Sequence, residues 1–358
     1  MRHLVDVSPE GGSPYPVYVG GAPDGMLAAL WRDRWRQAVL IGDETTASLF
    51  AAPLVRALEA RDVEVHVLRF PAGERSKTRE TKARLEDAML EAHVERDACI
   101  VGVGGGVALD LAGFVAATYQ RGIDHVFVAT TLLAQVDAAI GGKTGVDTPR
   151  GKNLIGAFHQ PKAVLCDYGA LASLDVSERR NGLAEMVKHA AVWDAALFRE
   201  LEGWSGEEAL PSEALVGRSI AAKAEVVSRD TRDRGIRQVL NFGHTVGHAL
   251  EAATDHSLPH GQAVAVGMTI EARVAARAGW LADDDARRLA ALLARLGLPT
   301  APPVAFSDAS SFLASDKKTA RGAVRCALPS TLGGVTPSGG SYTREVSYQA
   351  LAAAWSEP

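Results

Sequence analysis

Histidines are concentrated in one short part of the chain, at a spacing that suits metal binding. Of the ten histidines, His244, His248, His256 and His260 all lie between positions 244 and 260. On a helix, His244 and His248 would share one face at i,i+4, which is a spacing used by metal ligands. Thr245 follows His244, so the His-Glu-x-x-His pattern of zinc proteases is absent. The alternative is a pair of hydrogen-bonded core histidines with a third on the surface, and we favour the metal site.

A carboxylate ligand is expected to complete such a site. Glu185 lies among apolar residues in Gly182-Leu183-Ala184-Glu185-Met186-Val187, where an unpaired charge would be costly. A divalent metal would remove that cost. Glu251 is the rival carboxylate, although we interpret it rather as a charge on a helix surface.

A run of three glycines, Gly104 to Gly106, separates an apolar strand-type run from a helix-type run. Consecutive glycines let the backbone approach a ligand closely, and the amino end of the following helix favours phosphate oxygens. A tight turn without a ligand is the alternative. The run differs from the usual Gly-x-Gly-x-x-Gly dinucleotide pattern, and no Gly-Lys-Ser/Thr phosphate loop occurs at this point.

Cations recur in both halves of the chain. Lys143 and Lys152 lie in glycine-rich stretches that we expect to be loops, with Arg121 upstream, and together they suit a phosphate or carboxylate ligand. Arg232 and Arg234 could belong only to a solvated face. The other cations of the second half are Lys188, Lys223, Arg237, Lys317 and Lys318.

The order of expected elements predicts an α/β domain followed by a mainly helical domain. Strand-type runs alternate with helix-type runs in the first half, which is typical of a mostly parallel sheet. From about Ser177 onward the pattern is helical. We therefore predict an NAD-type α/β domain over 1–174 and a metal- and substrate-binding helical domain over 175–358. The expected strands are Ala38–Ile41, Val63–Leu68, Ala98–Val103, His125–Ala129, Ala163–Cys166 and Ala323–Leu328. The expected helices are Thr78–Val94, Leu111–Thr118, Glu178–Val192, Pro211–Arg229, Val239–Ala253, Gln262–Ala278 and Asp284–Leu296.

Composition excludes several classes of protein. The 358 residues are 47% hydrophobic and 23% charged, with a net charge of −5, so neither a nucleic-acid binder nor a disordered chain is indicated. We expect no signal peptide and no membrane span. Cys99, Cys166 and Cys326 are far apart, which favours reduced thiols and a cytoplasmic protein.

Taken together, these motifs resemble the 3-dehydroquinate synthase family. The resemblance covers about residues 35–330 in the family's order and spacing. Its motifs are Gly-Gly-Gly-Val-x-x-Asp at 104–110, Gln-Val-Asp at 135–137, Gly-Gly-Lys-Thr at 141–144, Gly-Lys-Asn at 151–153, Leu-Ala-Glu-x-x-Lys at 183–188, Asn-x-Gly-His-x-x-Gly-His at 241–248, His-Gly at 260–261 and Asp-Lys-Lys at 316–318.

The resemblance implies a role for each matching residue. Zinc or cobalt would be held by Glu185, His244 and His260, and His248 would be a substrate or proton-relay group. Homodimers are common in the family, and Arg121 would reach a neighbour's site. NAD positions would be Asp43, Glu74, Lys77, Gly105, Gly106, Asp110, Thr130, Thr131, Lys143 and Lys152. Substrate positions would be Arg121, Asp137, Lys143, Lys152, Asn153, Lys188, Lys223, Arg237, Asn241, His248 and one of Lys317 and Lys318. Catalytic positions would be Lys143, Lys188, Lys223, Arg237, Asn241 and His248.

The reaction that the resemblance implies is conversion of 3-deoxy-arabino-heptulosonate 7-phosphate to 3-dehydroquinate and phosphate, with transient oxidation by NAD. Other sugar-phosphate cyclases, such as aminodehydroquinate synthase, and NAD- and metal-dependent alcohol dehydrogenases are the alternatives. An effector-binding protein without catalysis is a further one. Gln262, Asp147 and Asp233 depart from the family pattern, and Gln262 could weaken an outer hydrogen bond to a metal-binding histidine.

Overall fold

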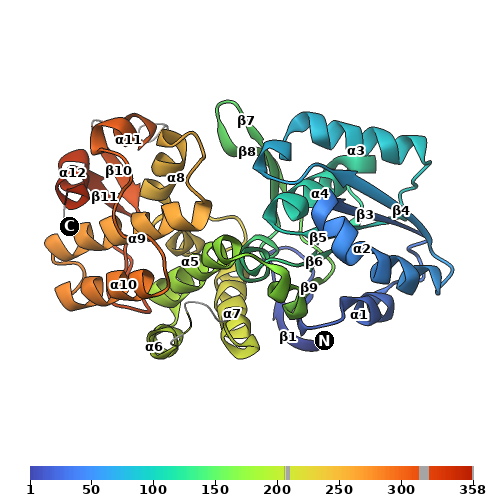
Figure 1. The fold of residues 1–358 in the computed structure, drawn as a ribbon, viewed down its shortest axis with the longest axis horizontal. Helices are drawn as coiled ribbons and strands as arrows, with labels where there is room; N and C mark the ends of the chain where they lie inside the picture. The colour runs from blue at the N-terminus through green and yellow to red at the C-terminus, as the bar shows by residue number, and fades with distance from the viewer. Residues whose placement is uncertain (205, 207–209, 314–321, 357–358) are drawn as a thin grey trace. The chain divides into compact units, whose positions relative to one another are not determined.

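The chain divides into two compact units. The computed structural model describes residues 1–204, 206, 210–313 and 322–356. We call Met1–Leu174 the N-terminal unit and Asp175–Pro358 the C-terminal unit. In Figure 1 the N-terminal unit is drawn in blue to green and the C-terminal unit in yellow-green to red. Among the described residues, no helix has the length and apolar character needed to cross a membrane.

The N-terminal unit is built on a seven-stranded sheet with the order β1-β2-β9-β6-β5-β3-β4. β1 and β2 pair antiparallel, and every other neighbouring pair is parallel. The mostly parallel α/β fold predicted for this half is therefore confirmed. The strands are β1 (Arg2–Val7), β2 (Tyr15–Gly20), β3 (Gln37–Asp43), β4 (Glu64–Phe70), β5 (Cys99–Gly104), β6 (Asp124–Ala129) and β9 (Val164–Asp167).

Helices cover both faces of the central strands, as parallel sheets require. Val101 and Val126 pack into a core with Leu54 and Leu58 of α2. On the other face, a Cβ at Gly102 would lie 3.0 Å from Ala112 of α4. This arrangement explains why β5 is apolar throughout. The helices are α1 (Pro23–Leu30), α2 (Glu44–Glu59), α3 (Arg79–Glu91) and α4 (Gly106–Thr118), with short turns η1 (Glu74–Ser76), η2 (Tyr119–Arg121), η3 (Ala134–Ala138) and η4 (Tyr168–Ser173).

An antiparallel hairpin, β7 (Lys143–Thr148) with β8 (Gly151–Phe158), follows η3. Our interpretation of Lys143 and Lys152 as loop residues was therefore wrong, because both lie in these strands. Gly145 pairs with Gly156, and a side chain at Gly156 would overlap the carbonyl of Thr144. The glycines that suggested loops are thus needed for close approach between the two strands.

The C-terminal unit is mainly helical, which confirms the predicted change of character. α9 is buried along most of its length and packs against α5, α8, α10 and α12. Short strands β10 (Ala323–Cys326) and β11 (Arg344–Ser347) form an antiparallel pair. The helices are α5 (Val176–Trp193), α6 (Ala195–Gly203), α7 (Glu213–Arg229), α8 (His244–Ala253), α9 (His260–Arg277), α10 (Asp283–Arg295), α11 (Phe306–Leu313) and α12 (Tyr348–Trp355), with the turn η5 (Ile236–Asn241).

The helix predicted over Val239–Ala253 is interrupted. η5 ends at Asn241, and α8 begins only at His244. Gly243 between them has φ +79, and a Cβ there would lie 2.8 Å from the carbonyl of Val264. Gly243 is required both by its left-handed backbone and by the closeness of α9, and the break makes His244 the first residue of a helix.

Candidate metal centre and ligand-binding residues

The C-terminal unit brings Glu185, His244 and His260 together. Glu185 comes from α5, and the two histidines are the first residues of α8 and α9. One ligand atom from each lies within 4.8 Å of the other two. Glu185 Oε1 is 3.5 Å from His244 Nε2 and 3.4 Å from His260 Nε2. One carboxylate oxygen and two imidazole nitrogens form a donor set that suits zinc or cobalt.

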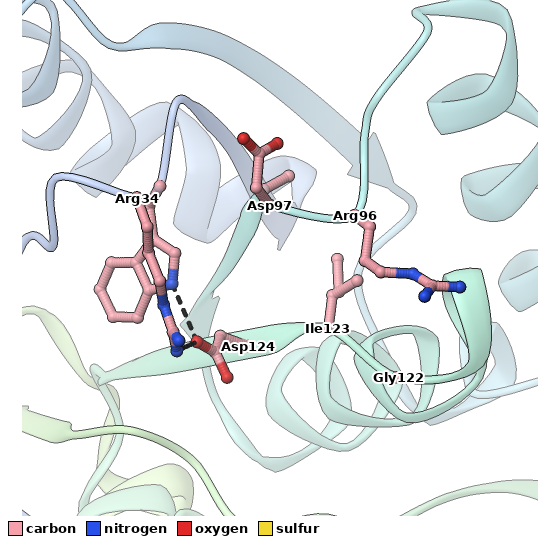
Figure 2. A pocket seen from close by; sticks show the side chains of 8 residues that line it. Arg34, Arg96, Asp97, Gly122, Ile123 and Asp124 are labelled. Carbon is pink, nitrogen blue, oxygen red and sulfur yellow. Dashed lines mark hydrogen bonds and ion pairs between the residues drawn. The ribbon is translucent and has the colours of Figure 1, made fainter.

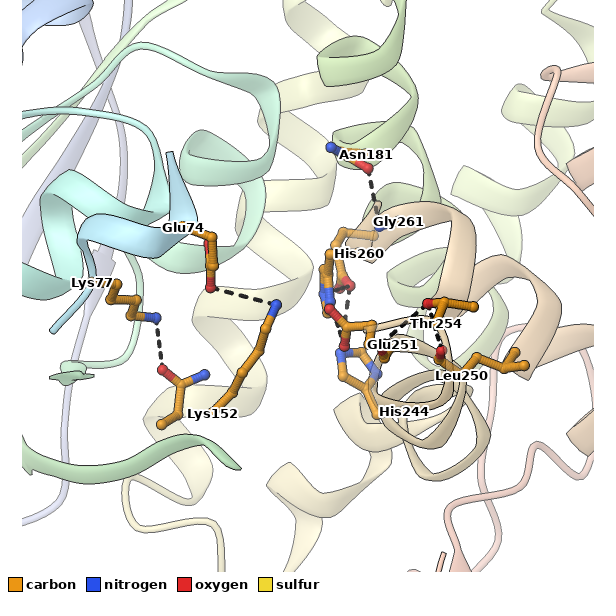
Figure 3. A network of polar contacts seen from close by, with 12 residues as sticks. Glu74, Lys77, Lys152, Asn181, His244, Leu250, Glu251, Thr254, His260 and Gly261 are labelled. Carbon is orange, nitrogen blue, oxygen red and sulfur yellow. Dashed lines mark hydrogen bonds and ion pairs between the residues drawn. The ribbon is translucent and has the colours of Figure 1, made fainter. Parts of the chain in front are cut away.

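The second nitrogen of each imidazole ring also has an acceptor. His244 Nδ1 lies 3.2 Å from the carbonyl oxygen of Phe242, and His260 Nδ1 lies 3.5 Å from Glu251 Oε2 (Figure 3). Because both acceptors favour an N–H at Nδ1, Nε2 of each ring is the nitrogen directed at Glu185 and the one that could bind a metal ion. Metal-binding histidines are commonly held in this way, so these residues fit a bound divalent cation.

Glu251 is a buried outer partner of the centre. Only 2% of this residue is exposed, so our interpretation of it as a helix-surface charge was wrong. Glu251 contacts His260, whereas Gln262, the departure thought to affect this bond, contributes only its backbone N–H to Pro259 among the hydrogen bonds of the described residues. The outer hydrogen bond to His260 therefore does not depend on position 262.

The electrostatic environment of the two histidines differs. Burial, together with Lys188, lowers the pKa of His244 to about 3. Burial also lowers the pKa of His260, but Glu185 and Glu251 more than offset this and raise that pKa to about 10. Glu185 is fully buried and forms an ion pair with Lys188. A divalent cation would take the place of the His260 proton, since metal binding releases protons.

His248 lies beside this centre but is exposed. Its ring centroid is 5.3 Å from that of His244 and 6.3 Å from that of His260. His248, Glu251 and His260 form a second group with ligand atoms within 4.8 Å of one another. The Glu185 group fits a metal better, because its carboxylate faces Nε2 of both half-buried imidazoles, while Glu251 contacts Nδ1 of His260.

Two buried side chains that the sequence interpretation did not identify hold the ligand-bearing helices. Asn181 Oδ1 accepts the backbone N–H of Gly261 at 3.0 Å, which fixes the start of α9 against α5 (Figure 3). Glu271 accepts the N–H groups of Gly243 at 2.8 Å and Val246 at 3.1 Å. Burial raises the pKa of Glu271 to about 8, while these backbone bonds act to lower it. An acidic residue in an apolar helical run was the sequence signal for Glu271.

Three predicted substrate cations of the C-terminal unit are buried. Lys188, Lys223 and Arg237 are exposed by only 2%, 6% and 3%. They come from α5, α7 and η5, which pack against one another. Buried cations need nearby carboxylates or an anionic ligand to offset the cost of desolvation. Asn241, at the end of η5, is half-buried, and Lys317 and Lys318 lie outside the described residues.

In the N-terminal unit, the glycine run forms the turn between β5 and α4. Gly104 has φ +145, Gly105 is the N-cap of α4 without a side-chain hydrogen bond, and Gly106 is the first helical residue. A Cβ at Gly105 would lie 3.1 Å from Thr131. Thr130, which is buried, donates its N–H to the carbonyl of Gly104 at 3.0 Å. The amino end of α4 therefore has the geometry that phosphate-binding turns use.

This turn lies where the direction of strand addition reverses. After β3 the chain adds β4 on one side, and β5, β6 and β9 extend the sheet on the other. Ligands of open α/β sheets bind at such a point, beyond the carboxyl ends of the strands. Asp43 ends β3 and accepts the N–H groups of Thr45 and Thr46, which caps α2. A Cβ at Gly104 would be 3.5 Å from Asp43 Oδ2, so both features share this edge.

A polar network connects η1, α4 and the β7–β8 hairpin. Lys77 Nζ lies 2.5 Å from Asp110 Oδ2 and donates to Asn153 Oδ1 at 2.6 Å. Lys152 Nζ lies 3.5 Å from Glu74 Oε1 (Figure 3). Burial raises the pKa of Asp110, and Lys77 acts against that rise. Five residues predicted to contact NAD or substrate therefore belong to one network.

The other predicted residues of this unit are less buried. Arg121 is exposed and lies at the end of η2 with φ +67. Asp137 is half-buried in η3, and Lys143 is exposed at the start of β7.

A pocket of about 370 Å³ lies at the opposite edge of the sheet, where β5 and β6 begin (Figure 2). Two carboxylates line it, and one of them, Asp124, accepts from Trp35 Nε1 at 2.9 Å and pairs with Arg34 and Lys162. Because these partners already satisfy Asp124, we interpret the pocket as structural.

The arrangement of the fold places the chain in a class of enzymes. The structure is similar to that of 2-deoxy-scyllo-inosose synthase complexed with carbaglucose-6-phosphate, NAD⁺ and Co²⁺, with a TM-score of 0.90, 24% identity and 99% of each chain covered. It is also similar to 2-epi-5-epi-valiolone synthase from Streptomyces hygroscopicus with NAD⁺ and Zn²⁺ bound, with a TM-score of 0.82, 31% identity and 95% of each chain covered. The fold is that of the sugar-phosphate cyclases.

Sequence comparison identifies the branch. Residues 67–181 match the family described as 3-dehydroquinate synthase N-terminal, and residues 182–319 match 3-dehydroquinate synthase C-terminal. The 3-dehydroquinate synthase of Halorhodospira halophila is 46% identical over 338 residues, which cover 91% of this chain and 92% of that protein. The chain belongs to the 3-dehydroquinate synthase family.

Proposed function

We propose that the chain is an NAD- and metal-dependent lyase that converts 3-deoxy-arabino-heptulosonate 7-phosphate to 3-dehydroquinate and phosphate. The observation that carries this proposal is the convergence of Glu185, His244 and His260, with Nε2 of both imidazoles directed at the carboxylate, in a chain of this family. The product belongs to the shikimate route of aromatic biosynthesis, and we place the enzyme in the cytoplasm.

Glu185, His244 and His260 would hold a zinc or cobalt ion. Phe242 and Glu251 would hold Nδ1 of the two histidines, so that Nε2 of each is directed at the ion. When bound, the metal would orient substrate hydroxyl oxygens as a Lewis acid and NAD would accept and return hydride. Because the Nδ1 contacts already orient both imidazole rings, metal binding would require little movement of these side chains.

NAD would bind at the reversal point of the N-terminal sheet. The N–H groups of Gly105 and Gly106 at the amino end of α4 suit its pyrophosphate. The comparison structure at 31% identity was solved with NAD⁺ and Zn²⁺ bound, which supports both cofactors. The residues we assign to NAD are Asp43, Glu74, Lys77, Gly105, Gly106, Asp110, Thr130, Thr131, Lys143 and Lys152.

The buried cations of the C-terminal unit would bind the substrate's anionic groups. Lys188, Lys223 and Arg237 are buried and lie on elements that pack against one another. Folding therefore positions the three cations before the substrate binds. Two hydrogen bonds hold Arg237. Its Nη1 donates to the carbonyl of Thr231 at 2.7 Å, and its backbone N–H donates to Asp230 at 3.1 Å. We assign catalytic or substrate contacts to Lys143, Asp137, Lys152, Asn153, Lys188, Lys223, Arg237, Asn241 and His248.

Phosphate release tests the proposal directly. The purified protein should release phosphate from the heptulosonate phosphate only with NAD and metal, and no net NADH should accumulate during this release. A chelator should stop the release. Arg237→Ala should raise KM for the substrate by roughly 10-fold or more, since charge-assisted hydrogen bonds contribute about 1.5–3 kcal/mol. NAD affinity should change little. The matched control is Arg229→Ala, an exposed arginine paired with Glu225. Equal losses of substrate and NAD binding would contradict the assignment.

Another sugar-phosphate cyclase activity is the second candidate, because the valiolone synthase is 31% identical over most of the chain. A panel of the heptulosonate phosphate, its amino analogue and sedoheptulose 7-phosphate discriminates the candidates. The substrate with the highest kcat/KM identifies the activity. Stoichiometric NADH release would instead indicate a dehydrogenase.

We also propose that the chain forms a homodimer, in which the exposed Arg121 reaches the partner's site. Light scattering during gel filtration should give twice the mass of 37.7 kDa. In mixtures of the Arg121→Ala and Arg237→Ala proteins, activity above the sum of the two variants measured alone would support sharing across subunits. Activity equal to the sum of the two would contradict it.

A further inference from the structure

Asn153 is held by two hydrogen bonds to its neighbours in the N-terminal unit. Its backbone is left-handed, with φ +55. Its N–H donates to Asp147 Oδ1 at 2.9 Å, and its side-chain Oδ1 accepts from Lys77 Nζ at 2.6 Å. Asp147 is itself anchored, because its own N–H donates to the carbonyl of Lys77 at 2.8 Å. The side chain of Asn153 is therefore fixed, although the residue is exposed.

The ammonium group of Lys77 decides which end of the amide it contacts. Lys77 is 5% exposed, and its Nζ lies 2.5 Å from Asp110 Oδ2. Burial acts to lower the pKa of Lys77, but Asp110 and Glu74 offset this and leave that pKa raised. Lys77 is thus a cation with donors and no acceptor. Only the amide oxygen of Asn153 can face it, so Nδ2 takes the opposite position.

We infer that Lys77 is a positioning residue that orients the Asn153 amide, so that Nδ2 donates a hydrogen bond to a ligand oxygen. The inference rests on the proposed function, in which Asn153 contacts the sugar phosphate. Among the described residues none hydrogen-bonds Nδ2, and both polar contacts of Lys77 Nζ are protein atoms. Lys77 therefore acts on the substrate through Asn153, in addition to any contact with NAD.

Asp147 also helps to position Asn153. In this chain an aspartate stands where the family pattern commonly has asparagine. Its Oδ1 accepts the N–H of Asn153, and burial raises its pKa, with Glu74 contributing in the same direction. An asparagine would provide the same acceptor oxygen. Asp147→Asn should therefore preserve substrate binding, whereas Asp147→Ala should weaken it.

Asn153→Asp tests the direction of the hydrogen bond, because it changes Nδ2 to oxygen at nearly constant size. Loss of a donor to an oxygen ligand, with a carboxylate in its place, should raise KM for the heptulosonate phosphate at least 10-fold. The change in kcat should be smaller, and Tm and the Kd for NAD should be unchanged. If Asn153 instead accepted from a substrate hydroxyl, Asn153→Asp would keep the wild-type KM, and the inference would be overturned.

A double-mutant cycle tests whether Lys77 acts through Asn153. Lys77→Met should raise KM in the wild-type background and add little in the Asn153→Ala background. Lys77→Gln, which keeps a donor, should partly restore KM. Additive effects of Lys77→Met and Asn153→Ala would overturn the inference. Should Lys77→Met fail to fold, the exposed Asn153→Asp variant and the Asp147 pair still decide the question.

The two proposals fail in different ways. Absence of phosphate release by the wild-type protein with NAD and metal refutes the proposed function. Substrate binding measured by calorimetry needs no turnover and tests the inference separately. Equal Kd values for wild type and Asn153→Asp refute the positioning role even if the wild-type enzyme is active.

Discussion

His260 lies between two carboxylates, Glu185 at Nε2 and Glu251 at Nδ1. The first is suited to share a metal ion with the imidazole, and the second pairs with Nδ1 and leaves Nε2 for the metal. Glu251 is buried and comes from α8, the same helix as His244. The properties of the centre therefore depend on residues outside the ligand set.

Glu251→Gln should lower metal affinity by roughly 10- to 100-fold, which is the usual cost of removing an outer carboxylate partner of a metal-binding histidine. The amide can still accept from Nδ1, so the fold should persist. Metal affinity is measured by competition with a chromophoric chelator. Glu59→Gln, an exposed change on α2, is the control and should leave affinity unchanged. Equal affinities for wild type and Glu251→Gln would contradict the role given to Glu251.

At the scale of elements, the start of α8 depends on a side chain from α9. Glu271 accepts N–H groups of the first turn, which no residue within α8 can satisfy. α9 thus supplies both a candidate ligand, His260, and the cap that places His244.

Glu271→Ala should reduce the free energy of unfolding by roughly 2–4 kcal/mol, because it leaves two buried N–H groups without an acceptor. Glu271→Gln retains one acceptor oxygen and should lose less. Both values come from urea unfolding of the metal-free protein followed by circular dichroism. If the two variants lost the same stability, the hydrogen bonds of Glu271 would not be the cause.

The contact between α6 and α7 includes an ion pair between Asp194 and Arg218, which is lost when acid protonates the aspartate. Burial acts to raise the pKa of Asp194, but Arg218 and the N–H groups of Leu197 and Ala196 offset this and leave that pKa below 3.8. Arg218 Nε lies 2.6 Å from Asp194 Oδ2. Since the folded-state pKa is lowered, the stabilisation is present above pH 3.8 and is lost as the pH falls through the folded-state pKa.

Asp194→Asn keeps the N-cap but loses the charge, so it should cost about 0.5–1 kcal/mol at pH 7 for a partly exposed pair. The difference from wild type should narrow as the pH falls below about 4. Unfolding by urea at pH 7, 5 and 3.5 measures it. A difference that stays constant over this range would show that the ion pair does not contribute.

At the scale of the molecule, the two units carry different parts of the proposed chemistry. The N-terminal sheet presents the glycine turn and its polar network, and the C-terminal helices present the carboxylate, the imidazoles and the buried cations. A ligand that binds only the folded chain stabilises it. The change in Tm with metal alone can therefore be compared with the change in Tm with NAD alone.

Zinc at 100 times its Kd should stabilise the chelator-treated protein by about 2.7 kcal/mol. Tm should rise by about 2–4 °C for each kcal/mol in a domain of this size. The increase is measured by scanning calorimetry. His244→Ala should show little increase with zinc while retaining its response to NAD. The same zinc response in wild type and His244→Ala would place the metal elsewhere.

The sequence alone determined the alternation of strands and helices in the first half, the helical second half and the glycine turn. Each of these follows from local periodicity or from consecutive glycines. It also brought Glu185, His244 and His260 forward, through their residue types and the family resemblance. Local patterns were less reliable where glycine had a packing role, as in β7, β8 and the break at Gly243.

Only the tertiary structure decided the partners of these residues. Burial of Glu251 and Glu271, the nitrogen that each histidine turns toward Glu185, and the contact of Lys77 with Asn153 all depend on packing between distant segments. A helical pattern shows which face of a helix is apolar, but not which element covers that face. Hydrogen-bond partners across such contacts are set by the three-dimensional arrangement, because a buried polar group must find its acceptor wherever the fold places one.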